Sequence, residues 1–253
     1  MNYFEALQQV KSTFLDGSEK SLVINQIVEH FKEGPLRILD MGIGDGRYVG
    51  KIVTELSRAD MTATVTGIDP LPASERVVHK FFPAFKVEPR RFEDYETNEI
   101  FDLVIATHSL YYVDARQVLA CVEKMVKLTR KGGLTIFVLW SEQCVLYKLY
   151  KLYKERCALN GGNGFITTEK TLNYLKSIKG IKVNLRYFYG RIVLSHWKSW
   201  PGVLENACLI FSRDFELHTV DKVRKEHTKS LRNAVDQFGD IEQRVNGVIF
   251  VHR

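Results

Sequence analysis

Apolar residues follow two alternating kinds of spacing between residues 36 and 140. Short apolar runs are typical of strands buried in a parallel sheet, and they occur at residues 36–41, 63–69, 84–89, 100–106 and 134–140. Apolar residues at three- and four-residue steps are typical of amphipathic helices, and they occur between these runs at 48–56, at 74–81 and after Asp114. Ser74 and Asp114 are the N-caps we expect for the latter two helices. The alternation predicts an α/β, Rossmann-like sheet with helices on both faces.

The chain on either side of this alternating region has a different pattern. Residues 3–33 predict two helices, interrupted at residues 16–18. Beyond Trp140 we expect helices at 145–156 and from Thr168 to about residue 178, and strands at 181–189 and 245–251. We therefore expect one domain over residues 1–253, with a helical cap at 1–34, the α/β core at 35–140, and substrate-side helices with closing strands at 141–253.

Glycines occupy alternate positions directly after the first predicted strand. Gly42, Gly44 and Gly46 follow Asp40 and Met41. Glycine permits positive φ and close approach of the backbone to a ligand, so the three residues predict a tight turn that presents main-chain N–H groups. Strand, glycine turn and helix together form the first unit of a nucleotide-binding fold. An ordinary tight turn is the alternative.

A second acid supports the nucleotide-binding interpretation. The run at 63–69 ends on Asp69, roughly 20 residues beyond the glycines, where a dinucleotide fold places the acid that binds ribose hydroxyls. The spacing Gly-x-Gly-x-Gly, however, lacks the third glycine of the NAD fingerprint G-x-G-x-x-G. A nicotinamide oxidoreductase is therefore disfavoured.

Composition and charge narrow the remaining classes. The 253 residues are 45% hydrophobic and 26% charged, as in ordinary globular proteins. No apolar run approaches the ~20 residues of a membrane span, and the N-terminus lacks the pattern of a secretory signal. The four cysteines form no C-x-x-C pair and the seven histidines show no metal-binding spacing, so we expect a cytoplasmic protein without a metal.

The order of these pieces over residues 35–140 resembles the class I S-adenosylmethionine (SAM)-dependent methyltransferases, with Asp40 and Asp45 flanking the glycines as in that family's first motif. The resemblance implies a seven-stranded sheet completed by the two C-terminal strands, SAM as cofactor and S-adenosylhomocysteine (SAH) as product. It also implies that the region after Trp140 forms a substrate lid. The residues it assigns to the cofactor are Asp40, Gly42, Gly44, Asp45, Asp69, Pro70, Glu93, Asp94, Thr107 and His108.

Short motifs over most of the chain are similar to those of histamine N-methyltransferase and its relatives. Glu5 in Tyr3-Phe-Glu-Ala-Leu matches a glutamate that binds the substrate's ammonium group in that family, and Leu110-Tyr-Tyr-Val matches its aromatic pair. His108 stands in place of an amide side chain, and Tyr150 in place of a tryptophan. The resemblance implies a small amine or imidazole substrate contacted by Glu5, Tyr111, Tyr112, Tyr147, Tyr150 and Asn246, with His108 and Tyr112 as candidate catalytic residues.

Two other classes of protein stay open. An RNA or DNA methyltransferase would fit the net charge of +6 and the basic segment at residues 222–232, although residues 106–109, Ala-Thr-His-Ser, lack the Asn/Asp-Pro-Pro-aromatic motif of enzymes that methylate base amino groups. A SAM-binding protein without catalytic activity is the other alternative. A solvated helix face explains the basic segment equally well, so we expect a small-molecule substrate rather than a nucleic acid, and no membrane partner. The sequence does not define an oligomeric state.

Overall fold

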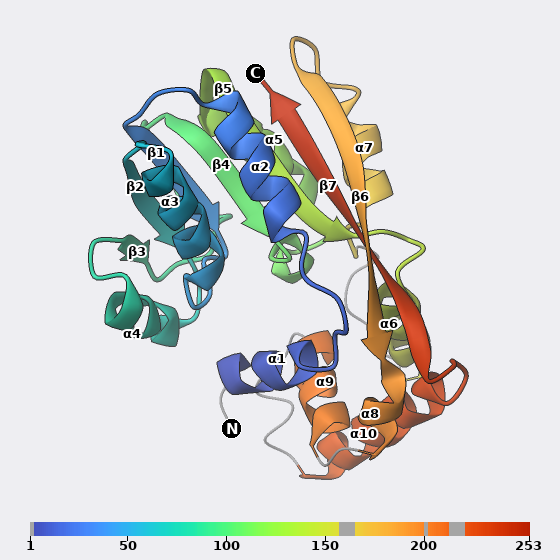
Figure 1. Cartoon of the computed structure of the whole chain (residues 1–253). Helices are drawn as coiled ribbons and strands as arrows, with labels where there is room; N and C mark the ends of the chain where they lie inside the picture. Colours follow the sequence, from blue (N-terminus) through green and yellow to red (C-terminus); the bar gives the residue numbers. More distant parts are fainter. Residues whose placement is uncertain (1–2, 157–164, 200–201, 213–220) are drawn as a thin grey trace. The chain divides into compact units, whose positions relative to one another are not determined.

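A computed structural model describes residues 3–156, 165–199, 202–212 and 221–253. Within these residues seven strands form one sheet in the order β3-β2-β1-β4-β5-β7-β6. The strands β1 to β5 run parallel, and β7 runs opposite to its two neighbours (Figure 1). Their bounds are β1 Leu36–Met41, β2 Ala63–Ile68, β3 Lys86–Glu88, β4 Phe101–Thr107, β5 Thr129–Trp140, β6 Lys182–Val193 and β7 Ile241–His252. This mixed seven-stranded α/β sheet confirms the predicted fold class.

Two compact units divide the chain, and the strands β6 and β7 each run from one unit into the other. The first unit comprises residues 1–18, 140–161 and 188–246, and the second comprises residues 19–139, 162–187 and 247–253. The second unit contains the parallel strands and the glycine loop. Each unit is described by itself below.

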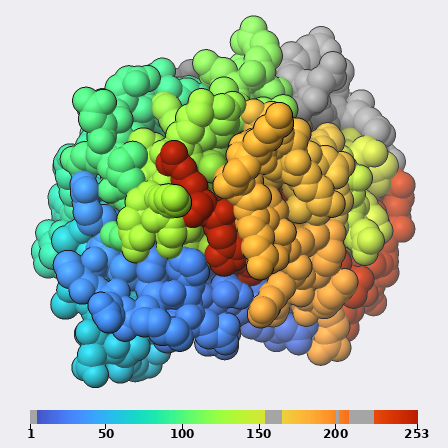
Figure 2. Space-filling model, turned by 90° about the horizontal axis from the view of Figure 1, so that it is seen from above, coloured from blue at the N-terminus to red at the C-terminus, as the bar shows by residue number. Residues whose placement is uncertain are grey.

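Helices cover both faces of the sheet in the second unit. The helices α2 (Lys20–His30) and α3 (Arg47–Arg58) pack on one face, and α5 (Val118–Leu128) lies on the other, beside α7 (Thr168–Leu175) (Figure 1). The short helix α4 (Pro72–Phe81) packs next to β3. Figure 2 shows the red C-terminal residues of β7 running between the green of β5 and the orange of β6, as the strand order requires.

The apolar run of β1 forms the centre of this unit because it is paired on both sides. Leu36 to Met41 pair in register with Ala63 to Ile68 of β2, and Asp40 pairs with Ile105 of β4. The apolar side chains of β1 are buried, and burying each one fully contributes about 1.5–3 kcal/mol. The central position of β1 therefore fixes the glycine loop that follows it.

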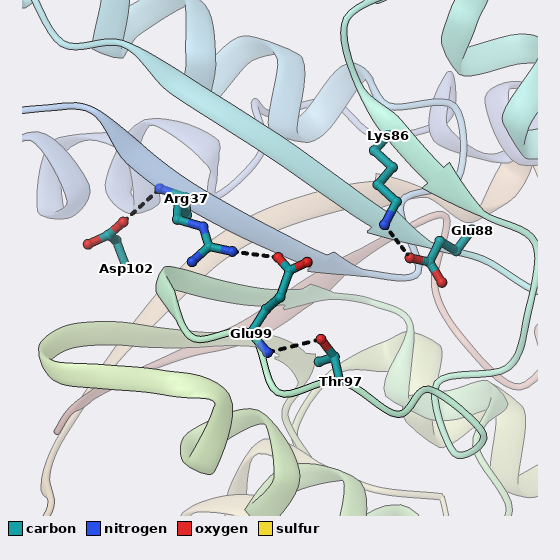
Figure 3. A network of polar contacts seen from close by, with 6 residues as sticks. All are labelled: Arg37, Lys86, Glu88, Thr97, Glu99 and Asp102. Carbon is teal, nitrogen blue, oxygen red and sulfur yellow. Dashed lines mark hydrogen bonds and ion pairs between the residues drawn. The ribbon is translucent and has the colours of Figure 1, made fainter.

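Polar contacts join Arg37, Glu99 and Asp102 at the opposite, N-terminal ends of β1 and β4, and a separate ion pair lies on β3 (Figure 3). The main-chain N–H of Arg37 donates to Asp102 at 2.7 Å, and its guanidinium donates to Glu99 at 2.5 Å. Lys86 pairs with Glu88 at 2.8 Å. These charges are largely exposed, and surface ion pairs contribute little individually, so these contacts fix loop geometry more than they stabilise the fold.

The first unit is mainly helical. It contains α1 (Tyr3–Lys11), α6 (Val145–Arg156), α8 (Leu194–Ser199), α9 (Val203–Ser212) and α10 (Asp221–Val235), and α10 packs against α6, α8 and α9. The buried indole of Trp197 donates to Thr13 at 3.0 Å. The guanidinium of Arg244 lies 4.3 Å from the ring of Phe14, a cation–π contact. The helix α10 is the basic segment that the sequence singled out.

Two helices begin at other residues than the pattern predicts. The helix α4 begins at Pro72 with Leu71 as N-cap, and the predicted cap Ser74 lies inside it with a buried hydroxyl. Proline is favoured in the first helical turn because its φ is already helical and it needs no N–H partner there. The helix α5 has Gln117 as N-cap, since Asp114 instead accepts hydrogen bonds from Arg116. The strand β5 begins at Thr129, five residues before the apolar run at 134–140 that predicted it, and its register against β4 shifts near this start.

Candidate cofactor and substrate site

The glycine loop connects β1 to α3 in the conformation that its sequence predicts. Gly42, Gly44 and Gly46 have φ of 84°, 58° and 73°, the left-handed region that favours glycine. The N–H of Gly42 donates to Ile68 at 2.7 Å, which ties the loop to the end of β2. A Cβ on Gly42 would overlap the Cβ of Ser109, so this position admits no larger residue without movement. The loop is therefore packed tightly against Ser109, and its main chain leads directly into the first turn of α3.

Asp69 lies directly after β2 and faces this loop. Its Oδ2 accepts the N–H of Gly44 and its Oδ1 accepts the N–H of Leu71, both at 2.9 Å. The side chain is buried, which raises its pKa above the ordinary value despite these hydrogen bonds. Each oxygen keeps acceptor capacity, because a carboxylate oxygen has about two lone-pair sites. The geometry suits an acid that binds two vicinal hydroxyls, as predicted for the ribose.

Asp40 is the most deeply buried acid of the site. It is 1% exposed, and its Oδ1 has no hydrogen-bond partner among the residues that the structure describes. Burial, and secondarily the charge of Asp69, raises its pKa to about 8. A buried polar atom without a partner is costly. A cationic ligand at the loop, such as the ammonium or sulfonium group of SAM, would relieve that cost, so the residues present fit this cofactor.

A third buried acid, Glu19, was missed by the sequence analysis. It is the N-cap residue of α2 and is 2% exposed. Its Oε1 lies 3.6 Å from the Nε2 of His108. The buried hydroxyl of Tyr48 has its pKa raised, chiefly by burial and then by the negative charges of Glu19 and Asp40. The only sequence signal for Glu19 was its position just before a helix, which does not distinguish a buried acid from a solvated one.

His108 follows β4 in a strained conformation. Its φ is +56°, which is uncommon for a residue with a side chain, and its N–H donates to Val138 at 2.9 Å. Its Nδ1 lies 3.2 Å from the hydroxyl of Tyr111. The Tyr111 ring is buried and stacked on Phe165, with centroids 4.5 Å apart. Strain of this kind at the carboxyl end of a strand is typical of functional sites.

The loop that contains the predicted cofactor residues Glu93 and Asp94 is held by one lysine. The Nζ of Lys124, on α5, donates to the carbonyl oxygens of Phe92, Glu93 and Tyr95 at 3.0, 3.1 and 2.7 Å. The same ammonium group lies 5.1 Å from the centroid of the Phe92 ring. Glu93 and Asp94 lie in this loop, which therefore has a fixed backbone beyond β3. The sequence analysis did not identify Lys124, because a lysine on an amphipathic helix usually faces solvent.

The other predicted cofactor residues lie at the same edge of the sheet. Thr107 ends β4 and is half-buried, and Pro70 is exposed beside Asp69. Asp45 accepts the N–H of Arg47 at 3.1 Å, a contact that supports the first turn of α3. A direct contact of Asp45 with the cofactor stays a prediction.

The predicted substrate residues are divided between the two units. Tyr111 and the half-buried Tyr112 belong to the second unit with His108. In the first unit, Glu5 is exposed on α1, and Tyr150 and Asn246 are buried. The half-buried Tyr147 also belongs to the first unit. The roles of the first-unit residues as substrate ligands stay predictions.

Residues 38–133 match the family model described as "Methyltransferase domain". Solved structures with the same fold include the YcgJ protein of Bacillus subtilis, with a TM-score of 0.63 and 11% identity over 92% of this chain and 97% of that chain. Another is described as a candidate sarcosine dimethylglycine methyltransferase of Galdieria sulphuraria, with a TM-score of 0.60 and 10% identity over 92% and 84% of the two chains. A third is the mycolic acid cyclopropane synthase CmaA1 complexed with SAH, with a TM-score of 0.57 and 12% identity over 91% and 83%.

The fold is therefore that of the class I methyltransferases, and residues 38–133 resemble the methyltransferase domain that the family model describes. A search of curated protein sequences gives no match to the chain. At these identities the solved structures establish the fold alone. In the part of the chain that the structure describes, no helix is both long enough and apolar enough to span a membrane, and no group of three or more His, Cys, Asp or Glu residues could hold a metal ion.

Proposed function

We propose that this chain transfers a methyl group from SAM to a nitrogen of a small amine or imidazole-type molecule. The observation that carries the proposal is the pairing of the buried Glu19 carboxylate with His108, 3.6 Å apart, at the end of the strand next to the glycine loop. A buried carboxylate attracts a cationic group strongly, because charge interactions are poorly screened away from water.

The aromatic side chains next to His108 support the same class of acceptor. The hydroxyl of Tyr111 lies 3.2 Å from His108, and its ring stacks on Phe165. Aromatic faces attract cations by their quadrupole, with about 0.5–2 kcal/mol per contact. A carboxylate near aromatic rings is suited to an ammonium or imidazolium group, because both the charge and the ring faces attract a cation.

SAM supplies an activated methyl group when bound, and the protein's part in the reaction is mainly positioning. Asp40, Asp69 and the main chain of the glycine loop would hold the cofactor, and the loop at residues 92–95 would border its adenine. Holding two reactants in line can contribute about 7–11 kcal/mol to lowering a barrier. By their resemblance to the histamine N-methyltransferase family, Tyr147, Tyr150 and Asn246 are further candidate substrate residues, and Glu5 is the alternative to Glu19 as the acid that binds the amine.

The proposal is tested by incubating the protein with methyl-labelled SAM and two separate acceptor pools, a panel of small amines that includes histamine and total RNA. We expect label in one or more amines, identified by mass spectrometry of the product. Label confined to RNA would overturn the proposal and would instead favour the basic helix α10 as a binding surface. No label in either pool, with SAH bound in a calorimeter, would favour a binder without this activity.

A further inference from the structure

We propose that His108 takes the proton from the acceptor nitrogen, that Glu19 holds the charged amine beside it, and that Tyr111 is a positioning residue for the His108 ring. The inference rests on the proposed function, since it concerns the amine that this function requires. It assigns a role that sequence spacing does not define, because Glu19 is distant in sequence from His108 and Tyr111, which are three residues apart.

The distance between the Glu19 carboxylate and the His108 imidazole leaves room for a bridging N–H group. The Oε1 of Glu19 and the Nε2 of His108 are 3.6 Å apart, too far for a good hydrogen bond. A small N–H group placed beside them can contact both atoms, each at an ordinary hydrogen-bond distance. The carboxylate would then hold the charged amine while the imidazole nitrogen lies within reach of one of its protons.

The other ring nitrogen of His108 contacts Tyr111. The Nδ1 of His108 lies 3.2 Å from the hydroxyl oxygen of Tyr111. When that oxygen accepts the Nδ1–H, the neutral ring has its lone pair on Nε2, which is the nitrogen that faces Glu19. The stacking of Tyr111 on Phe165 fixes the hydroxyl, and the strained backbone of His108 fixes the ring. These contacts orient the ring, and the proposal requires the Nδ1–H tautomer.

The proton transfer and the methyl transfer require only these side chains, the amine and the bound methyl donor. A protonated amine has no lone pair, so one N–H proton passes to Nε2 and the amine regains its electron pair. That pair forms the new N–C bond as the C–S bond of the methyl donor breaks, and the electrons of the broken bond stay on sulfur. The resulting imidazolium is stabilised by the carboxylate of Glu19 and later releases its proton to solvent.

Other ionisable groups near His108 also affect the charge at this site. Glu19 lies at the start of α2, Tyr111 follows β4, and Tyr48 on α3 is coupled by charge to both Glu19 and Asp40. Asp40 in turn is coupled to Asp69. The ionisation of these groups therefore also contributes to the pH dependence of the reaction. A variant of His108 itself is needed to isolate the contribution of His108.

The kinetic test compares His108→Gln, Tyr111→Phe and the control His30→Gln with the unaltered protein, using the amine found by labelling. We expect kcat of His108→Gln to fall about 10²- to 10⁴-fold at neutral pH, the range that general bases contribute. The loss should shrink as the pH approaches the amine's own pKa, because solvent then deprotonates it. Tyr111→Phe should lower kcat and alter the pH profile with unchanged SAH affinity. His30, a half-buried residue at the end of α2 whose ring contacts Gly132, should have no effect on kcat.

A retained kcat with an unaltered pH profile in His108→Gln would overturn the role of His108 alone. A protein that labels no amine at all would instead remove the proposed function, so the two failures are distinguishable. Nitrogen-15 NMR of the histidine rings gives a second readout that needs no turnover. We expect the Nδ1–H tautomer for His108 and a shift toward the other tautomer in Tyr111→Phe, whereas an Nε2–H tautomer in the unaltered protein would contradict the proposal.

Discussion

The main-chain N–H of Gly44 donates a hydrogen bond of 2.9 Å to the Oδ2 of Asp69, which joins the loop after β1 to the acid after β2. The two residues are 25 positions apart in the sequence. Their contact fixes the carboxylate over the glycine loop before any ligand binds. Preorganisation of this kind reduces the entropy lost on binding.

Asp69→Ala should greatly weaken cofactor binding. The substitution removes the acceptor for two predicted ribose hydroxyls, and hydrogen bonds to a charged group contribute about 1.5–3 kcal/mol each. We therefore expect the Kd for SAH, measured by calorimetry, to rise about 100-fold or more. Asp236→Ala, at an exposed position, is the control and should bind SAH normally. Near-normal affinity in Asp69→Ala would contradict the cofactor assignment.

Gly42→Ala should destabilise the protein more than Gly180→Ala does. Both glycines have positive φ, 84° and 81°, so both substitutions carry the same backbone strain of about 1–2 kcal/mol. The new Cβ at Gly42 would overlap Ser109, whereas none of the described residues lies within 4 Å of a Cβ on Gly180. The free energy of unfolding, from urea titration, should fall by at least about 1 kcal/mol more in Gly42→Ala. Equal losses would show that the loop can move away from Ser109.

Asp40→Asn should change how the stability of the protein depends on pH. The carboxyl has a pKa of about 8 in the folded protein against an ordinary value of 3.8, so between these values the folded state binds more protons than the unfolded state. Asp40 therefore lowers the free energy of unfolding as the pH rises, by at most about 1.4 kcal/mol per pH unit. Its effect is absent below about pH 4 and constant above about pH 8.

The measurement for Asp40 is a series of urea titrations between pH 5 and pH 8 on both proteins. The asparagine amide in the variant does not titrate, so the variant should gain stability relative to the unaltered protein as the pH rises. Parallel curves over this range would mean that Asp40 ionises at an ordinary pH. SAH binding, measured alongside, should weaken in the variant because an amide cannot ionise to pair with the ammonium group of the ligand.

Lys124→Met should loosen the loop at residues 92–95. The substitution removes three hydrogen bonds from an ammonium group to main-chain carbonyl oxygens, and we expect a loss of roughly 2 kcal/mol in the free energy of unfolding. It should also raise the Kd for SAH. Lys127→Met on the same helix is the matched control, since the ammonium group of Lys127 forms an exposed ion pair with Glu123. Equal SAH affinity in the two variants would remove the loop from the cofactor site.

The sequence predicted the fold well because its strongest signals are local. The buried runs that became β1 and β4, and the glycines after β1, are each dictated by residues adjacent in the chain. The same holds for α6, whose predicted bounds at residues 145–156 are those observed. The pattern also indicated β6 and β7, although both strands are longer than their apolar alternation suggested.

The residues that the sequence analysis missed depend on contacts between distant segments. Glu19 looks like an ordinary acid at a helix start, and only the position of α2 beside His108 shows that it is buried. Lys124 looks like a solvated lysine until the loop at residues 92–95 is placed over it. The helix starts at Pro72 and Val118 differ from prediction because capping preferences are weak compared with the path that the preceding loop must take.

The central claim is that the buried Glu19 beside His108 receives the acceptor amine. The most direct measurement is the KM for the labelled amine in Glu19→Gln, with Glu5→Gln on α1 as the comparison. We expect the KM to rise at least about 10-fold in Glu19→Gln, because the interaction of a buried carboxylate with a cation is stronger than a single hydrogen bond between neutral groups. SAH affinity should change much less. An unchanged KM in Glu19→Gln, with a raised KM in Glu5→Gln, would contradict this account and restore Glu5 as the residue that binds the amine.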